Sequence, residues 1–508
     1  MGPDREFRIK KIGYLNVAVL TLVLTLLPLL AMGGSVPKAI CGPNDRVETG
    51  LQGQTTLAER LSGDSELGYN CNLELVGQSQ GEGSKWQMAS FEDCAYYGQD
   101  NNFNNPLTQH PGVVVLDASD PRNPLVTEYL TSRAMQDPHE SLKVNEKRKL
   151  LGATKGPGFG PTAPADRQFA FYDVQSDCTQ PKLLSEVDVP GHSGHAGDFA
   201  PDGMTYWGTG GGGITAMDIS DPSNPRLIGR FLHRTHDISI SEDGTRAYLA
   251  QQGNFVPFGA PGPNGLVILD VSDIQFRRPN PQPRVISTLF WQDGGVAQQA
   301  FPVTYRGRPH LIFTDETGAG PATPASAAKA EACRLGLPPF GFARIIDISN
   351  ETKPKIIARL MLEVHDPANC GRVLNDFVPD IADLDFYGYS SHYCTVDKAE
   401  NPKMLACAYL GAGLRVFDIR DPYHPREIAY YKPPARRTAY LPGSALWADY
   451  GGRDRTTDRV QTKFRFRKHK GETHLWFVGQ DNGFQIVRFT KSMHELLGKD
   501  KSKDNDDD

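Results

Sequence analysis

The sequence predicts an all-β fold, a seven-bladed β-propeller of four-stranded blades, and three observations lead to it. A short apolar phrase recurs along the chain, 51 Gly and 38 Pro lie in many short clusters, and no long segment has the 3.6-residue periodicity of a helix. A unit repeated at intervals of roughly 45 to 77 residues is typical of a propeller or a solenoid. The seven copies occupy residues 113–117, 169–173, 214–218, 266–270, 343–347, 414–418 and 484–488.

One unit shows how the phrase becomes a blade. Residues 236–241 alternate polar and apolar side chains, residues 242–245 suit a hairpin turn, and residues 246–250 return as a second strand. Residues 266–270 then supply the third strand, and residues 284–290, which follow a proline-rich turn, supply the outer strand. The repeated phrase is therefore expected to be the third strand of each blade.

The ring is expected to close through the N-terminal part of the chain. The last copy, residues 484–488, has no convincing fourth strand after it. Residues 72–78 resemble outer strands such as residues 225–230. We expect this early segment to complete the seventh blade, which would remove two exposed sheet edges. The propeller then spans residues 71–492.

The two ends of the chain have compositions of their own. Residues 1–34 have the pattern of a signal peptide, with basic residues before an apolar stretch of about 15 residues, short for a membrane span of roughly 20. Residues 35–70 are an N-terminal extension, and residues 493–508 an acidic tail. We expect export to the periplasm, the cell surface or the medium, with membrane attachment if the signal stays uncleaved.

Eight cysteines fit an oxidising compartment. Cys394 and Cys407 flank a hairpin turn almost symmetrically, which places them opposite each other on two strands and predicts a disulfide. Cys333 and Cys370, around the fifth repeat, are a second candidate pair. Three pairings remain open for Cys41, Cys71, Cys94 and Cys178.

Residues 266–270, Leu-Val-Ile-Leu-Asp, give the chain a family resemblance. The repeats resemble the LVIVD repeat of exported or surface-attached bacterial propellers, over about residues 71–492. The resemblance implies the fold, and it implies no particular activity. The aspartates that end the repeated strands are expected to accept backbone N–H bonds from the turn that follows. They are Asp117, Asp218, Asp270, Asp347 and Asp418.

Three long excursions interrupt the repeats. Residues 131–166, 316–341 and 432–470 are predicted to be surface loops, with one short helix at residues 140–151. Four acidic residues are candidate catalytic acids that the sequence does not pair, and we expect them instead to be solvated loop carboxylates: Asp315, Glu316, Asp383 and Asp385.

Four polar residues are predicted to form a ring in the central channel. His195 and His236 each lie eight residues before the glycine of a hairpin turn, as does Gln299. His392 lies eight residues before Glu400, in the next such turn. Equivalent positions of innermost strands converge on the channel, so these side chains are expected at one depth.

Such a ring suits one divalent first-row transition metal, which could polarise a substrate or activate water. Three histidines and a glutamine on a propeller are similar to the metal site of oligogalacturonate lyases, where the metal neutralises a uronate carboxylate before proton abstraction. The same spacing would also arise from repeat duplication in a polar channel without a metal.

The sequence favours an exported binding module for a protein, glycan or cell-wall ligand. The alternative is a metal-dependent exported enzyme, a lyase or hydrolase or an oxidoreductase, with the four residues as ligands. A third hypothesis is a structural surface protein. The net charge of −6, with both signs interspersed, argues against a nucleic-acid partner.

Overall fold

The computed structural model describes residues 34–99, 108–156, 167–210, 213–253, 263–319, 325–375, 388–436, 441–444 and 456–498. From Gly34 onward the chain forms one compact unit. The expected signal peptide, apart from Gly34, and the acidic end from Lys501 lie outside the described residues. Among the helices of the described ranges, none is long and apolar enough to cross a membrane.

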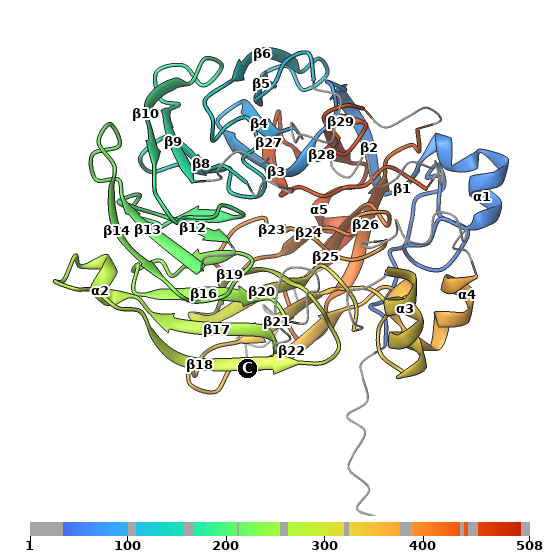
Figure 1. Cartoon of the computed structure of the whole chain (residues 1–508). Helices are drawn as coiled ribbons and strands as arrows, with labels where there is room; N and C mark the ends of the chain where they lie inside the picture. Colours follow the sequence, from blue (N-terminus) through green and yellow to red (C-terminus); the bar gives the residue numbers. More distant parts are fainter. Residues whose placement is uncertain are drawn as a thin grey trace, which may run out of the picture. The chain divides into compact units, whose positions relative to one another are not determined.

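The described chain is an all-β seven-bladed propeller of antiparallel blades (Figure 1). The first three blades are β3–β6, β7–β10 and β11–β14, with strands β3 (Lys85–Phe91), β4 (Cys94–Gly98), β5 (Val113–Asp117), β6 (Leu125–Leu130), β7 (Lys143–Asn145), β8 (Leu150–Thr154), β9 (Gln168–Asp173), β10 (Lys182–Asp188), β11 (Gly197–Phe199), β12 (Thr205–Gly210), β13 (Gly213–Asp218) and β14 (Arg226–Phe231). The fourth and fifth are β15–β18 and β19–β22, with β15 (Ile238–Ile240), β16 (Arg246–Gln251), β17 (Asn264–Asp270), β18 (Arg284–Trp291), β19 (Ala297–Tyr305), β20 (Arg308–Asp315), β21 (Ala343–Asp347) and β22 (Lys355–Leu360). The sixth and seventh contain β23 (Cys394–Val396), β24 (Met404–Ala408), β25 (Leu414–Asp418), β26 (Arg426–Lys432), β27 (Arg465–His469), β28 (Glu472–Gly479) and β29 (Gly483–Phe489).

All seven copies of the repeated phrase are third strands, as predicted. The pairing between the third and outer strands shifts register at a similar place in every blade, for example between Val115 and Leu116 and between Ile268 and Leu269. Such a bulge increases the local twist of the strands. The strand-end aspartates accept turn N–H groups as expected: Ser119 N donates to Asp117 at 2.8 Å.

Strand β2 (Leu73–Ser79) closes the ring, which confirms the prediction for the seventh blade. It pairs antiparallel with β29, from Leu73 opposite Phe489 to Ser79 opposite Phe484. The first strand of the described chain, β1 (Tyr69–Cys71), instead pairs with β26 and gives the sixth sheet a fifth strand. The N-terminal segment therefore holds two blades together.

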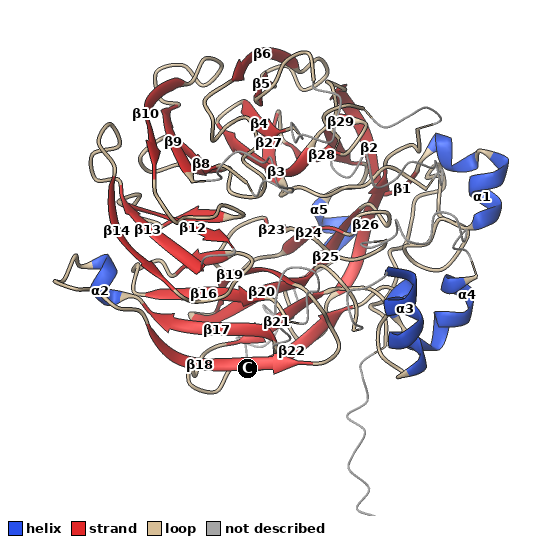
Figure 2. Cartoon of the chain, in the orientation of Figure 1, coloured by secondary structure: helices blue, strands red, loops and turns tan. Residues whose placement is uncertain are grey.

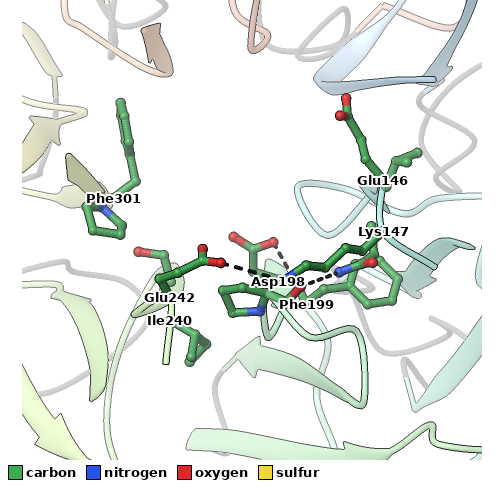
Figure 3. A pocket seen from close by; sticks show the side chains of 12 residues that line it. Glu146, Lys147, Asp198, Phe199, Ile240, Glu242 and Phe301 are labelled. Carbon is green, nitrogen blue, oxygen red and sulfur yellow. Dashed lines mark hydrogen bonds and ion pairs between the residues drawn. The ribbon is translucent and has the colours of Figure 1, made fainter. Parts of the chain in front are cut away.

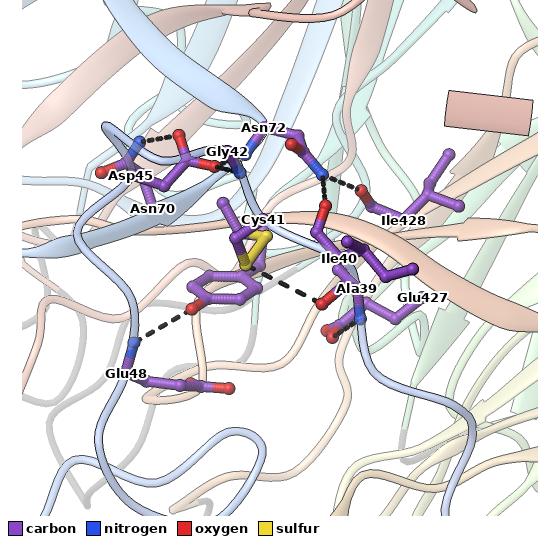
Figure 4. The surroundings of a disulfide bond; sticks show 12 residues. Ala39, Ile40, Cys41, Gly42, Asp45, Glu48, Asn70, Asn72, Glu427 and Ile428 are labelled. Carbon is purple, nitrogen blue, oxygen red and sulfur yellow. Dashed lines mark hydrogen bonds between the residues drawn. A yellow bond between two sulfur atoms is a disulfide. The ribbon is translucent and has the colours of Figure 1, made fainter. Parts of the chain in front are cut away.

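The N-terminal extension is anchored on that fifth strand (Figure 4). A disulfide joins Cys41 to Cys71. Close to it, Asn72 Nδ2 donates to the carbonyl oxygens of Ile40 and Ile428, at 2.9 and 2.8 Å. These contacts tie the extension to β1 and to β26.

All eight cysteines form disulfides: Cys41–Cys71, Cys94–Cys178, Cys333–Cys370 and Cys394–Cys407. Cys394 and Cys407 are directly paired residues of β23 and β24, as the hairpin argument predicts. The Cys94–Cys178 bond links the first blade to the second.

The helices are short and lie outside the sheets (Figure 2). The Cys333–Cys370 bond joins two of them, α3 and α4. The α-helices are α1 (Leu57–Ser62), α2 (Ser272–Gln275), α3 (Ala325–Arg334), α4 (Cys370–Leu374) and α5 (Met493–Leu497), and the 3-10 helices are η1 (Asp64–Leu67), η2 (Glu363–His365) and η3 (Pro367–Asn369).

The prediction of a loop with one helix at residues 140–151 was wrong. This segment contains β7 and β8, the two inner strands of the second blade. A blade must pair its third strand on both sides, and this sheet requirement overrides the local helix preference. The excursion at residues 432–470 likewise contains β27, the innermost strand of the seventh blade.

Candidate metal centre

The innermost strands bring distant parts of the chain together. Neighbouring innermost strands contact each other in the order β3, β7, β11, β15, β19. His195, His236 and His392 each lie two residues before an innermost strand, so their side chains meet in the channel. The Nε2 atoms of His195 and His236 are 2.8 Å apart.

The fourth predicted ligand, Gln299, is not in this cluster. Its side-chain oxygen accepts the backbone N–H of Cys394 at 3.0 Å. Its neighbour Gln298 lies in the cluster, with Nε2 3.1 Å from His392 Nε2. The pairing of β19 with β20 shifts register between Ala297 and Gln299, so Gln298 is the extra residue of a bulge. Bulges re-aim side chains next to functional sites, and residue spacing alone does not show them.

A carboxylate that the sequence analysis missed lies at the centre of the cluster. Glu140 precedes β7, and its backbone N–H donates to His195 O at 3.1 Å, which sets the two residues side by side. Glu140 Oε2 lies 3.2 Å from Nε2 of both His195 and His236. The side chain of Glu140 is 2% exposed.

The other oxygen of Glu140 faces a different set of groups. Oε1 lies 3.0 Å from His392 Nε2 and accepts Gln298 Nε2 at 3.0 Å. Glu316, immediately after β20, contacts the same histidines: Oε1 is 3.5 Å from His392 Nε2 and Oε2 is 3.7 Å from His236 Nε2.

The expectation of solvated loop carboxylates was wrong for two of the four residues. Asp315 and Glu316 are both buried. Asp315 ends β20 and pairs with the buried Arg344 at 2.6 Å, while Glu316 enters the channel. Asp383 and Asp385 lie outside the described residues.

His139 and Trp86 complete the surroundings. Ligand atoms of His139, Glu140 and His195 lie within 4.8 Å of one another. His139 has a φ of 49°, a conformation that side chains other than glycine adopt at a cost, often beside functional sites. The rings of Trp86 and His392 have centroids 5.2 Å apart.

Burial and mutual charge set the protonation of the cluster. Burial would raise the pKa of Glu140, but His236, His195 and His392 outweigh it and hold that pKa well below its usual value. Burial lowers the pKa of His236 to about 3. For His392, burial acts downward, yet hydrogen bonds to Glu140 and Glu316 raise the pKa to about 10. Burial, aided by Glu140 and opposed by His392, raises the pKa of Glu316.

The spacing of these atoms fits a bound cation. Ligand atoms at about 2.1 Å from a metal lie about 3 Å apart in octahedral geometry and about 3.4 Å apart in tetrahedral geometry. His195 Nε2, His236 Nε2 and Glu140 Oε2 are 2.8, 3.2 and 3.2 Å apart. Imidazole and carboxylate together suit first-row metals such as Mn, Fe, Cu or Zn.

The orientation of His392 also suits a ligand. Its Nδ1 lies 2.5 Å from the carbonyl oxygen of Gln461, which fixes the Nδ1–H tautomer when the ring is neutral and leaves the Nε2 lone pair directed at the cluster. A backbone carbonyl commonly orients a metal-bound histidine in this way.

A pocket of about 380 Å³ lies at the other end of the same innermost strands. It is lined by residues in or just after β7, β11 and β15, and by Phe301 and Pro302 in the middle of β19. Figure 3 shows Phe301 on one side and Glu146 and Lys147 on the opposite side, with Asp198 and Glu242 between them.

The fold and site define a seven-bladed propeller with a His/Glu cluster in its channel, and the match to one repeat model agrees with the fold. The LVIVD repeat model matches residues 197–233, which include β11 to β14. No curated protein sequence matches the chain.

Two solved structures are similar in fold. The Kuenenia stuttgartiensis hydrazine synthase is 14% identical, covering 82% of this chain and 98% of that one, with a TM-score of 0.49. The β-propeller domain of Myceliophteria thermophila Cps50 (Swd1) is 10% identical, covering 82% and 100%, with a TM-score of 0.46.

Proposed function

We propose that this chain is a metal-dependent enzyme whose metal centre lies in the propeller channel. His195, His236 and Glu140 would hold the metal, with His392 and Glu316 beside them. The observation that carries the proposal is the position of Glu140 Oε2, at 3.2 Å from two imidazole nitrogens that are themselves 2.8 Å apart.

Hydrogen bonding alone satisfies this arrangement poorly. One proton shared by the two imidazoles occupies both Nε2 atoms and leaves Glu140 Oε2 without an N–H donor from either ring. Among the described residues, Oε2 has no hydrogen-bond donor of good geometry. Buried polar atoms are nearly always partnered, so an unpartnered carboxylate oxygen surrounded by ligand atoms points to a cation.

A bound metal would supply Lewis-acid activation of a substrate oxygen or of water. The protein contributes the closed surroundings: His236 and His392 have side chains 2% and 0% exposed, whereas His195 is 23% exposed. Access is therefore from the His195 side, and a small substrate, or a narrow end of a larger one, fits. A lyase or hydrolase suits this centre best.

Export is part of the proposal. Four disulfides are typical of proteins that mature in an oxidising compartment. The basic and apolar character of residues 1–34 adds to this. The enzyme would work in the periplasm, at the surface or outside the cell.

Metal content tests the proposal. Full-length protein secreted or exported by the producing cell, and never exposed to chelators, should carry metal that co-purifies through dialysis. Glu140→Gln should lose it while keeping the wild-type circular dichroism spectrum. His424→Ala is the control, because the His424 side chain is exposed and, within the described part of the chain, forms an ion pair with Asp421 away from the channel ligands. Metal that persists in Glu140→Gln, or is lost in His424→Ala, contradicts the channel site.

The pocket at the other end of the channel favours a second candidate, the binding module. Its lining combines the rings of Phe199 and Phe301 with the carboxylates of Asp198 and Glu242. Aromatic and polar groups together are typical of ligand sites. Sedimentation with purified peptidoglycan tests one ligand class: wild-type protein should co-sediment and Phe301→Ala should not. Equal behaviour of the two proteins contradicts this pocket as the cell-wall site.

A further inference from the structure

We propose that the channel holds two metal ions, not one, bridged by the carboxylates of Glu140 and Glu316. This inference rests on the proposed metal centre and extends it.

The two oxygens of Glu140 lie closest to different histidines. Oε2 lies 3.2 Å from His195 Nε2 and from His236 Nε2. Oε1 lies 3.0 Å from His392 Nε2. A carboxylate that binds a single ion directs one or both of its oxygens at that ion, beside the same histidines. Here each oxygen has its own histidine set, which is the arrangement of a bridging carboxylate.

Glu316 repeats the pattern independently, from a different blade. Its Oε2 is 3.7 Å from His236 Nε2, and its Oε1 is 3.5 Å from His392 Nε2. Both carboxylates thus span the same gap with one oxygen on each side. Each side also has further potential ligand atoms nearby. Two sets have their ligand atoms within 4.8 Å of one another: His139, Glu140, His195 and Glu140, Glu316, His392.

The first position would be held by His195, His236 and one oxygen of each carboxylate, with His139 close by. The second would be held by His392 and the other two oxygens. Gln298 contacts both His392 and Glu140, and its amide is the remaining neutral group at the second position. Two-metal sites of this kind have ions about 3.5–4 Å apart, a separation that a three-atom carboxylate bridge allows.

The charge of the site favours bound cations. Two buried carboxylates share this space with histidines that come from other strands. A buried charge is costly unless it is paired or coordinated. Cations between the carboxylates and the histidines would pair both charges, and the contact of His392 Nδ1 with the carbonyl oxygen of Gln461 leaves Nε2 directed at them.

The chemistry follows from a paired centre. Two ions at this spacing stabilise both the attacking and the leaving oxygen of a displacement. The predicted substrate class is therefore a small ester or anhydride of an oxyacid that enters from the partly exposed side of His195. Water attacks the central atom, the bond to the leaving oxygen breaks, and that oxygen takes the proton released by the water.

Manganese loading of the full-length protein tests this inference. Metal-free wild-type protein is titrated with Mn²⁺, and bound metal is measured by elemental analysis and electron paramagnetic resonance. We expect two equivalents and a spectrum of two exchange-coupled ions. His392→Gln should bind one equivalent with the six-line spectrum of an isolated ion, and His424→Ala should match wild type.

The outcomes separate the two proposals. One equivalent with an isolated-ion spectrum in wild type overturns the paired centre and leaves the single-metal enzyme standing. No bound metal overturns both. Two equivalents without coupling mean separate sites and overturn the bridge. The wild-type measurement decides even if His392→Gln does not fold.

Discussion

At the scale of single residues, Glu140 determines what the channel can do. The three histidines alone could be polar residues of a water-filled channel. A carboxylate whose oxygens face two different histidine sets makes the cluster specific. Its position follows from β7, which brings Glu140 beside His195 through a backbone hydrogen bond.

Two adjacent glutamines offer a matched comparison at this scale. Gln298→Ala should weaken metal binding about 10- to 100-fold, since partners of metal ligands have effects of this size. Gln299→Ala should leave metal binding unchanged and lower the unfolding free energy by about 1–3 kcal/mol, because the buried N–H of Cys394 loses its acceptor. Metal titration and urea unfolding measure both. If Gln299→Ala weakened metal binding and Gln298→Ala lowered only stability, Gln299 would be the residue at the metal, as the sequence predicted.

Sequence reasoning located the histidines because their hairpin turns carry recognisable residues. It missed Glu140 because the turn of the second blade uses Lys149, with a φ of 56°, where the third and fourth blades use Gly203 and Gly244. Even with that turn recognised, the eight-residue spacing leads to Ser141, the residue after Glu140. Asn145, whose side chain accepts the N–H of Arg148, was the available turn signal. Gln298 could not be predicted, since the bulge that re-aims it has no signature in one sequence.

At the scale of elements, the bulge within the outer strand of the seventh blade is packed closely. In β2, a Cβ at Gly77 would lie 2.2 Å from the carbonyl oxygen of Pro121, in the β5–β6 turn. Gly77→Ala should therefore lower the unfolding free energy by about 1–3 kcal/mol. Gly371→Ala is the control, because a Cβ there meets nothing within 4 Å. Equal stability of the two variants in urea would contradict the role of Gly77 in ring closure.

Asp458, in the segment that leads from the sixth blade to the seventh, should make the free energy of unfolding depend on pH. Asp458 accepts the N–H groups of Asp481 and Asn482 at 3.0 and 2.9 Å. Burial, with the nearby Asp481 carboxylate, raises the pKa of Asp458 to about 7 from an unfolded value of 3.8. The folded state then binds this proton more tightly, so its contribution to stability is complete below pH 3.8 and is lost as the pH rises to about 7.

Asp458→Asn should remove that dependence. The difference in unfolding free energy between wild type and variant, measured in urea from pH 4 to pH 8, should change across this window and be flat above it. A constant difference at every pH would show that Asp458 titrates at its ordinary value.

Most strands could be predicted because each blade of a β-propeller repeats the same sequence pattern. All seven third strands and the ring-closing strand follow from the repeated phrase. The error at residues 140–151 arose where one blade departs from the pattern in length and turn residues. Secondary structure in that segment depends on pairing with β9, which local sequence does not encode.

At the scale of the whole molecule, the disulfides should differ in how much they contribute to the free energy of unfolding. In the chain-entropy account, a longer closed loop restrains the unfolded chain more. The Cys94–Cys178 bond spans 84 residues and joins two blades, whereas Cys394–Cys407 spans 13 within one hairpin. Replacing both cysteines by alanine should cost about 4–5 kcal/mol for the first bond and about 3 kcal/mol for the second. A larger loss for the hairpin bond, measured by urea unfolding, would contradict this order.

The ring also explains how distant residues form one site. Residues 139–140, 195, 236, 298, 316 and 392 come from five blades and the connections between them. Closure by β2 holds these blades in a circle, so stability of the ring and geometry of the centre are linked. Loss of closure is expected to weaken metal binding without any change in the ligands.

The most direct measurement is an anomalous difference map from crystals of the native protein, collected at the absorption edges of the metals found by elemental analysis. The account predicts two peaks about 3.5–4 Å apart in the channel, one beside Oε2 of Glu140 with His195 and His236, the other beside Oε1 with His392. A channel without an anomalous peak in protein that carries metal elsewhere would contradict the central claim.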